Sequence, residues 1–254
     1  MLQSFIIVLR EGFEGFLIVA ITLAYLIRTQ QKFLVPAVYL GLIASLAVSA
    51  GLGFWLWQGA SGPLWEGIFG LISAVFIGWL VWHMWVTAPR LKKDMEVRLT
   101  TATQNKSVLA AQLGVFIFTI LMISREGMET ALLLIQVHEP QIILGVSLGA
   151  ICAAGMCFLW TRFSHLIDLK RFFQVTSIFL FLFIIQILIY SFHEFTEAGI
   201  FPNSEALHVA TEPFSPEGLY GKWFTLIMIA ICGVWLLISR WRARASKKTE
   251  SVGN

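Results

Sequence analysis

The stretch that decides the fold is Ile7-Val8-Leu9-Arg10-Glu11-Gly12-Phe13-Glu14-Gly15-Phe16-Leu17-Ile18, which places three charged residues inside an apolar run. A second copy, Met122-Ile123-Ser124-Arg125-Glu126-Gly127-Met128-Glu129, lies in another apolar run, with its arginine 115 residues after the first. One charged side chain at the bilayer centre costs about 2.5–3.5 kcal/mol on insertion scales, so such a cluster requires partners or a bound ion. The two copies therefore predict two halves of one buried site.

Apolar residues dominate the whole chain. Of its 254 residues, 57% are hydrophobic and 13% are charged, against roughly 45–50% and 25% in soluble domains. Seven apolar segments are each near the ~20 residues that a helix needs to cross a bilayer. They cover residues 2–27, 34–57, 64–87, 108–135, 141–161, 172–195 and 222–240. We therefore expect an all-α, polytopic membrane protein in which residues 1–254 form a single transmembrane domain of seven helices, without a separate soluble catalytic domain.

The basic residues predict the orientation of these segments. Fifteen of the 18 Lys and Arg fall after the first, third, fifth and seventh segments. Because Lys and Arg concentrate in cytoplasmic loops, the N-terminus is expected outside and the C-terminus, with the basic tail 241–254, in the cytoplasm. This placement accounts for the net charge of +3 without nucleic acid as a partner, and leaves membrane lipid as the surrounding medium.

The orientation makes the duplicated motif more informative. The first and fourth segments would run in opposite directions, as expected of an inverted three-plus-three repeat with a seventh helix appended. Repeat one would cover about residues 1–90, repeat two about 106–200, and the last helix about 222–240. Outside the motif the two halves have diverged, so the repeat is predicted mainly from the motif itself.

Helix geometry suggests what the motif residues do. Residues three or four apart share a helix face, so Arg10, Glu11 and Glu14 project together, as do their three counterparts in the second motif. The four carboxylates, Glu11, Glu14, Glu126 and Glu129, offer hard oxygen donors that suit a hard cation, including ferric iron. Arg10 and Arg125 would balance part of their charge. Arg-Glu pairs that clasp two helices and bind nothing are the alternative, but the two surplus glutamates favour a metal.

These residues carry a family resemblance. The two Arg-Glu-Gly-x-Glu motifs, the seven segments, and Phe192-His193-Glu194 followed by Glu197-Ala198-Gly199 resemble the oxidase-dependent iron permeases, in their bacterial EfeU-like branch related to the fungal high-affinity iron permease. The resemblance implies a permease that takes ferric iron across the cytoplasmic membrane, with iron as substrate, no permanent cofactor, and the six charged motif residues as the translocation site. It also implies a separate extracytoplasmic oxidase or iron-binding protein as partner.

Other polar residues are weaker candidates for binding metal on its way to the motifs. They are Glu66, His193, Glu194 and Glu197, each near the predicted outer end of a segment. Two other functions remain open from the residues alone. One is transport of another cation, such as manganese or protons. The other is a membrane di-iron oxidoreductase, although such enzymes use Glu-x-x-His pairs and these motifs are Glu-x-x-Glu.

Overall fold

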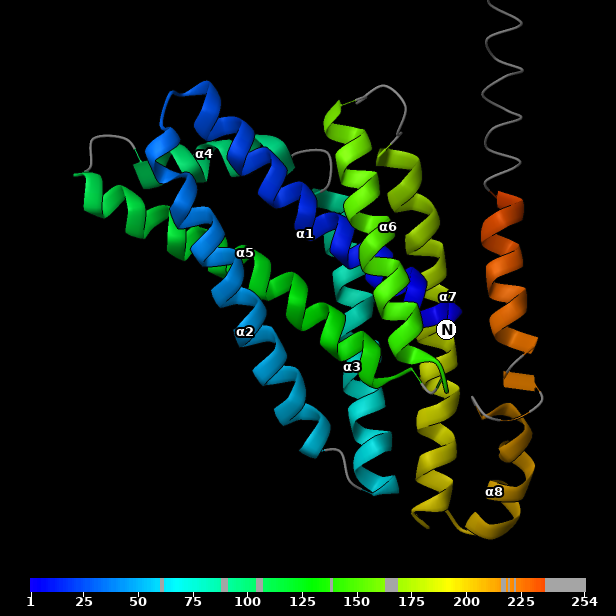
Figure 1. Cartoon of the computed structure of the whole chain (residues 1–254). Helices are drawn as coiled ribbons and strands as arrows, with labels where there is room; N and C mark the ends of the chain where they lie inside the picture. Colours follow the sequence, from blue (N-terminus) through cyan, green and yellow to red (C-terminus); the bar gives the residue numbers. More distant parts are fainter. Residues whose placement is uncertain are drawn as a thin grey trace, which may run out of the picture. The chain divides into compact units, whose positions relative to one another are not determined.

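The structure is a computed structural model, and all the regular secondary structure of its described residues is helical (Figure 1). It describes residues 1–59, 62–87, 91–103, 107–137, 139–162, 169–215, 218, 220–221 and 223–235. The elements are α1 (Leu2–Arg28), η1 (Lys32–Leu34), α2 (Val35–Gly59), α3 (Pro63–Thr87), α4 (Leu91–Thr103), α5 (Val108–Ile135), α6 (Ile142–Arg162), α7 (Leu169–Glu197), α8 (Ser204–Thr211), η3 (Glu212–Phe214) and a last helix, Trp223–Trp235. The end of the seventh predicted segment, 236–240, and the basic tail 241–254 lie outside the described residues.

Each predicted segment contains a helix, and the ends of the first six agree within three residues. Five helices are long and apolar enough to cross a membrane: Lys32–Phe54, Pro63–His83, Val108–Ile135, Ile142–Leu159 and Phe172–Glu197. The helix α1 has the required length, but Arg10, Glu11 and Glu14 distinguish it from this apolar group. The chain is therefore an all-helical, polytopic membrane protein.

The helices form two compact units, which are described separately. Unit 1 comprises Met1–Ser61 and Trp82–Ile167, and unit 2 comprises Gly62–Val81 and Asp168–Asn254. Within unit 1, α1 and α5 contact each other, and each has one more extensive partner: α6 lies along α1, and α2 lies along α5. Both charged motifs therefore belong to unit 1.

Small residues four positions apart allow these pairings. They are Gly41, Ser45, Ser49 and Gly53 on α2, and Gly145, Gly149, Ala153 and Cys157 on α6. Small residues at this spacing let membrane helices approach closely. A methyl group at Gly41 would lie 2.8 Å from Cβ of Thr119 on α5, and one at Gly149 would lie 2.8 Å from the carbonyl oxygen of Phe5 on α1. Neither position has room for a larger side chain.

The connection expected as a loop after the third segment contains the helix α4. The basic residues of this connection indicated a cytoplasmic loop. However, Met95 and Leu99, which lie one turn apart, are buried. Met95 packs in a cluster with Ile18 and Ile123, and Leu99 packs in a neighbouring cluster with Tyr25 of α1 and with residues of α2 and α5. These two apolar residues pack α4 against unit 1, and a hydrogen bond of 2.8 Å between the hydroxyls of Thr100 and Tyr25 adds to the contact.

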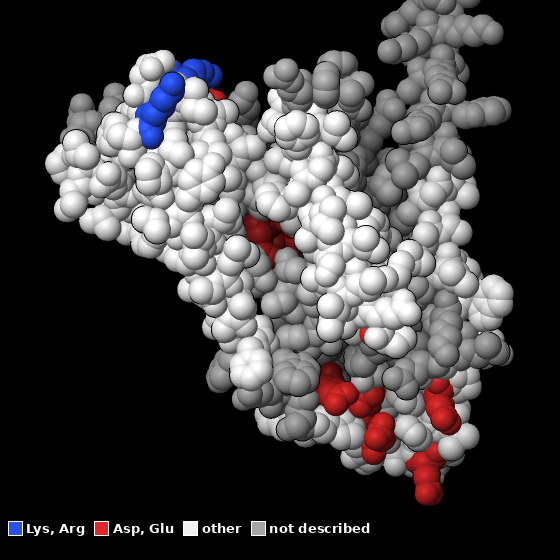
Figure 2. Space-filling view, in the orientation of Figure 1, with Lys and Arg blue, Asp and Glu red and all other residues white. Residues whose placement is uncertain are grey.

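In unit 2, α3 and α7 contact each other at the end where α3 begins. A methyl group at Gly67 would lie 2.7 Å from the ring of Phe195, so the two helices are close at this level. After α7 the chain reverses through Gly199 and Asn203, which have φ angles of +73° and +62°, and α8 packs back against α7. Figure 2 shows acidic side chains gathered over this end of unit 2.

Candidate metal site on helices α1 and α5

All four predicted carboxylates are buried in unit 1. Their exposed fractions are 1% for Glu11, 5% for Glu14, 8% for Glu126 and 3% for Glu129. One oxygen each of Glu11, Glu126 and Glu129 lies within 4.8 Å of the others, so both motifs contribute to one group. Figure 2 shows acidic side chains at the bottom of a hollow beside α1.

In the first motif, one arginine serves two carboxylates. The Arg10 side chain is 2% exposed and forms ion pairs with Glu11 and with Glu14, the latter at 3.2 Å between Nη2 and Oε1. The pairing with Glu14 follows from their i, i+4 spacing, whereas the pairing with the adjacent Glu11 requires the guanidinium to fold back along α1. A charge this deeply buried must be paired, so Arg10 is held firmly between its two partners.

In the second motif, the arginine has one carboxylate partner. Arg125 Nε donates a hydrogen bond to Glu129 Oε1 at 2.8 Å, and 38% of the Arg125 side chain is exposed. Glu126 forms no ion pair with any of the residues that the structure describes. The second motif therefore presents a carboxylate whose charge no neighbouring cation neutralises directly.

Two carboxylate oxygens in the group are both buried and unpaired. Glu11 Oε2 and Glu126 Oε2 have no hydrogen-bond partner among the described residues. A buried polar atom without a partner costs about 1–3 kcal/mol, and more when it is charged. A cation placed between these oxygens would remove that cost, and the all-carboxylate donor set suits a hard cation.

Glu14 lies beside this group rather than within it. It is near enough to Glu129 for their charges to interact, but its carboxylate pairs with Arg10. Of the four predicted ligands, three therefore form the group. The fourth, Glu14, lies next to it and pairs with Arg10.

The motifs have a serine neighbour that sequence reasoning missed. Ser49 on α2 lies opposite Gly127, where an added methyl group would be 2.6 Å from Ser49 Cβ. The Ser49 hydroxyl is buried and has no partner within the described part of the chain. Its place in the stripe of small residues on α2 was the signal, but only carboxylate and histidine side chains had been considered as ligands.

The weaker candidates separate into two groups in unit 2. Tyr190 donates a hydrogen bond to Glu66 Oε2 at 2.7 Å and also reaches Glu194, so these two carboxylates share one phenol. His193 and Glu197 instead lie with His208 of α8. His208 was not among the predicted site residues, because nothing in the sequence indicated that α8 folds back onto α7.

Comparison with known proteins decides the family. The profile of the iron permease FTR1 family matches residues 1–235. The chain belongs to the iron permease FTR1 family. It is therefore a multi-pass iron permease and a transporter rather than an enzyme, which confirms the predicted resemblance and removes the oxidoreductase alternative.

Relatives of the chain come from both bacteria and archaea. It is 28% identical over 217 residues to the "Ferrous iron permease EfeU" of Escherichia coli O6:H1, covering 82% of this chain and 78% of that protein. It is 25% identical over 234 residues to the protein of the same name from Yersinia pestis, covering 87% and 82%. An uncharacterized protein of Archaeoglobus fulgidus is 29% identical over 237 residues, covering 87% and 83%. No solved structure matches this FTR1 family member.

Proposed function

We propose that this permease moves iron across the cytoplasmic membrane through the carboxylate cluster of α1 and α5. Glu11, Glu14, Glu126 and Glu129 would be the iron ligands, and Arg10 and Arg125 would balance their charge. The observation that carries this proposal is the pair of buried, unpartnered carboxylate oxygens, one from each motif, in a group whose ligand atoms lie within 4.8 Å.

The charge of the cluster suits transport better than permanent storage. Four ionised glutamates and two arginines leave a formal charge of minus two, which attracts a cation. A transport site must also release its ion. Arg10 competes with the metal for Glu11 and Glu14. Its ion pairs with these carboxylates can therefore form again when iron leaves.

Carboxylate donors favour Fe(III) as the transported form, because hard oxygen ligands prefer a hard, highly charged cation. The Escherichia coli and Yersinia relatives, however, are named ferrous iron permeases. Fe(II) is therefore the second candidate, and the transport assay must supply each oxidation state separately.

We also propose the inverted repeat, seven crossings and an outer N-terminus. The packing of the small residues supports the repeat, because matching positions face each other in both halves. The pairs are Gly41 with Thr119, Gly145 with Ser4, Gly127 with Ser49, and Gly12 with Ala153. In each match the residues of α1 and α5 differ by 115 positions, and those of α2 and α6 differ by 104. A separate extracytoplasmic oxidase or iron-binding protein would deliver iron on the outer side, where Glu66 and Glu194 would receive it.

The test is iron uptake by proteoliposomes that contain the purified protein. Iron would be supplied either as Fe(II) with ascorbate or as Fe(III) with citrate. Glu126→Gln and Glu129→Gln should each reduce uptake at least about tenfold, because each removes an oxygen donor and its charge. The matched control is Glu96→Gln on α4, whose glutamate pairs at 3.8 Å with Arg28 away from the motifs. Uptake near the wild-type rate in both cluster variants would refute the proposed path.

A further inference from the structure

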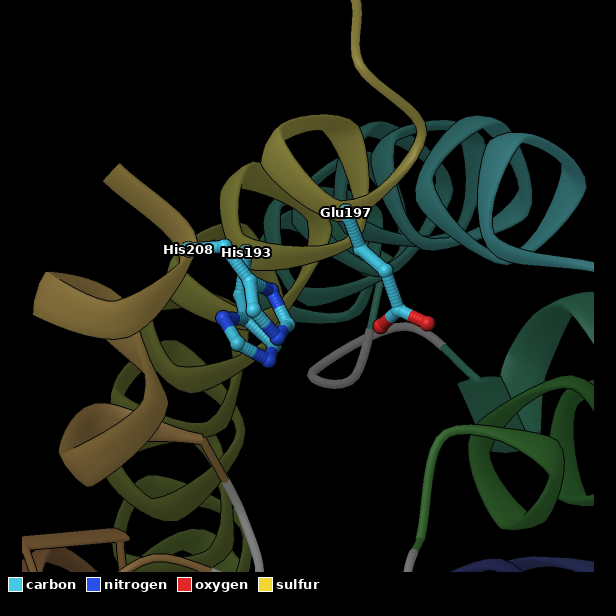
Figure 3. A group of neighbouring side chains, drawn as sticks. All are labelled: His193, Glu197 and His208. Atoms are coloured by element: carbon cyan, nitrogen blue, oxygen red, sulfur yellow. The ribbon is translucent and has the colours of Figure 1, made fainter. Parts of the chain in front are cut away.

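Unit 2 contains a second group of metal-binding residues with different chemistry. One ligand atom each from His193, Glu197 and His208 lies within 4.8 Å of the other two. Figure 3 shows the two imidazole rings stacked, with the Glu197 carboxylate on the same side of α7. Their ring centroids are 4.6 Å apart and their planes differ by 19°.

The local fold accounts for this arrangement. His193 and Glu197 are one helical turn apart at the end of α7, so they share a face. The turn through Gly199 and Asn203 then reverses the chain, and α8 places His208 against the ring of His193. The histidines come from different helices, so the group exists only when α8 is docked on α7.

Hydrogen bonds determine which nitrogen of His193 can bind a metal. Nδ1 of His193 lies 2.8 Å from the hydroxyl oxygen of Thr211. That hydroxyl donates its own proton to a backbone carbonyl of α8, either that of Leu207 at 2.9 Å or that of His208 at 3.1 Å. When that proton is on a carbonyl, the Thr211 oxygen accepts from Nδ1–H of His193. This tautomer leaves the lone pair on Nε2, as in histidines that bind metals and donate through their other nitrogen.

His208 supplies an independent indication of metal binding. Its Nδ1 atom is buried and has no hydrogen-bond partner among the described residues. A buried ring nitrogen without a partner is costly unless something binds there. Both histidines thus carry a nitrogen that the protein itself leaves free.

We propose that His193, Glu197 and His208 form a site for a divalent transition-metal ion, Fe(II) in the cell. Two imidazoles and one carboxylate with open positions are typical of non-haem Fe(II) sites, whereas the motif cluster offers oxygen donors alone. The identification of the ion as iron rests on the proposed function, but the metal site itself does not. The permease would therefore bind the divalent ion at the end of α7 through nitrogen ligands that the carboxylate cluster lacks.

Metal binding by the full-length protein in lipid nanodiscs tests this site. Mn²⁺ is the spectroscopic probe, and Fe(II) binding is measured by anaerobic equilibrium dialysis. We expect histidine-nitrogen couplings in the pulsed-EPR spectrum of bound Mn²⁺. His208→Ala should remove the His208 contribution to these couplings and weaken Fe(II) binding at this site at least about tenfold. Thr211→Val, which removes only the acceptor for His193 Nδ1–H, should weaken it about 10–100-fold, the usual cost of losing such an outer partner.

Two further variants test whether these effects are specific to this site and independent of the carboxylate cluster. Glu205→Gln, on the exposed face of the same helix α8, should leave both the couplings and the affinity unchanged, because Glu205 is outside the group. Glu129→Gln should reduce transport at least about tenfold yet keep the nitrogen couplings. Bound Mn²⁺ without nitrogen couplings, or wild-type Fe(II) affinity in His208→Ala, would overturn the site. Normal transport by Glu129→Gln with the couplings intact would refute the proposed path and leave this site standing.

Discussion

The motifs on α1 and α5 share the same charged residues but differ in how the fold uses them. Arg10 is 2% exposed and holds two carboxylates, whereas Arg125 is 38% exposed and holds one. Identical short sequences therefore do not imply identical roles. In the first motif both carboxylates pair with a buried arginine, whereas in the second the arginine is partly exposed and Glu126, which has no ion pair among the described residues, is left to interact with a cation.

The surroundings of the two helices cause this difference. Fourteen of the 27 residues of α1 are buried, against seven of the 28 residues of α5. The helix α1 contacts α2, α4, α5 and α6, so its charged residues face protein. A membrane helix can carry such charges only where neighbouring helices satisfy them.

Replacement of each arginine should give the largest difference in stability between the two motifs. Arg10→Ala leaves two carboxylates buried without their cation, which costs about 3–5 kcal/mol for a buried pair. We expect it to prevent stable folding. Arg125→Ala loses one partly exposed pair, and we expect a folded protein with reduced iron uptake. Thermal unfolding in detergent and size-exclusion chromatography measure the stability of both variants. The proteoliposome assay measures iron uptake by Arg125→Ala. Equal stability of the two variants would show that burial does not distinguish the arginines.

Glutamate replacement should separate folding from iron binding. Glu126→Gln removes a carboxylate without an ion pair, so we expect unchanged or higher thermal stability. Iron affinity should fall about 100-fold, or ~2.8 kcal/mol at about 1.4 kcal/mol per tenfold. Glu11→Gln should lower both quantities, because it also removes a partner of Arg10. Parallel measurements of melting temperature and iron binding test this, and a destabilised Glu126→Gln would mean that Glu126 has a structural partner.

The sequence predicted the helices well because the signal for them is repeated along the chain. A membrane helix needs a long apolar run, and each such run became a helix. The sequence also indicated the two motifs, because charged residues inside apolar runs are unusual and require explanation. The positions of Arg10 and Arg125 relative to the surface were not predictable, because exposure depends on which helices pack around each motif.

Other features escaped prediction for related reasons. The helix α4 is too polar to be recognised as part of the core, although its apolar residues Met95 and Leu99 are buried there. His208 became a candidate ligand only through the turn before α8. The stripes of small residues on α2 and α6 were visible in the sequence, but their matching partners on α5 and α1 could be identified only from the packed helices.

Replacement of the motif glycines should give a smaller difference in melting temperature between the two motifs. A methyl group at Gly127 would lie 2.6 Å from Ser49 Cβ, whereas one at Gly12 would lie 3.2 Å from Ala153 Cβ. Overpacking costs about 1–3 kcal/mol, so Gly127→Ala should lower the melting temperature more than Gly12→Ala does. Ser49→Gly should restore stability to Gly127→Ala but not to Gly12→Ala. A double-mutant cycle measures this coupling, and absence of rescue would contradict the facing positions.

The smallest expected effect concerns how the two motif helices begin. Ser107 caps α5 locally by accepting a hydrogen bond from the amide of Ala110 at 3.4 Å. The start of α1 is instead capped by Glu139 from the α5–α6 connection, which accepts from the amides of Gln3 at 3.1 Å and Ser4 at 3.3 Å, and from the Ser4 hydroxyl at 2.9 Å. The caps therefore differ in charge as well as in sequence distance.

This difference predicts a pH dependence for α1 alone. Partial burial would raise the pKa of Glu139, but its hydrogen bonds, including one from the Met1 amino group, outweigh burial and lower that pKa. A lowered carboxyl pKa contributes stability above the unfolded value of about 4.3, and this contribution disappears as the pH falls through the folded value. Glu139→Gln should cost about 0.5–2 kcal/mol at neutral pH, as loss of a helix cap does, and progressively less in acid. Ser107→Ala should cost a similar or smaller amount at every pH, because a hydroxyl does not titrate. Melting temperatures of both variants and the wild type between neutral and acidic pH test the contrast, and a Glu139→Gln deficit that persists in acid would show that the carboxylate charge does not stabilise α1.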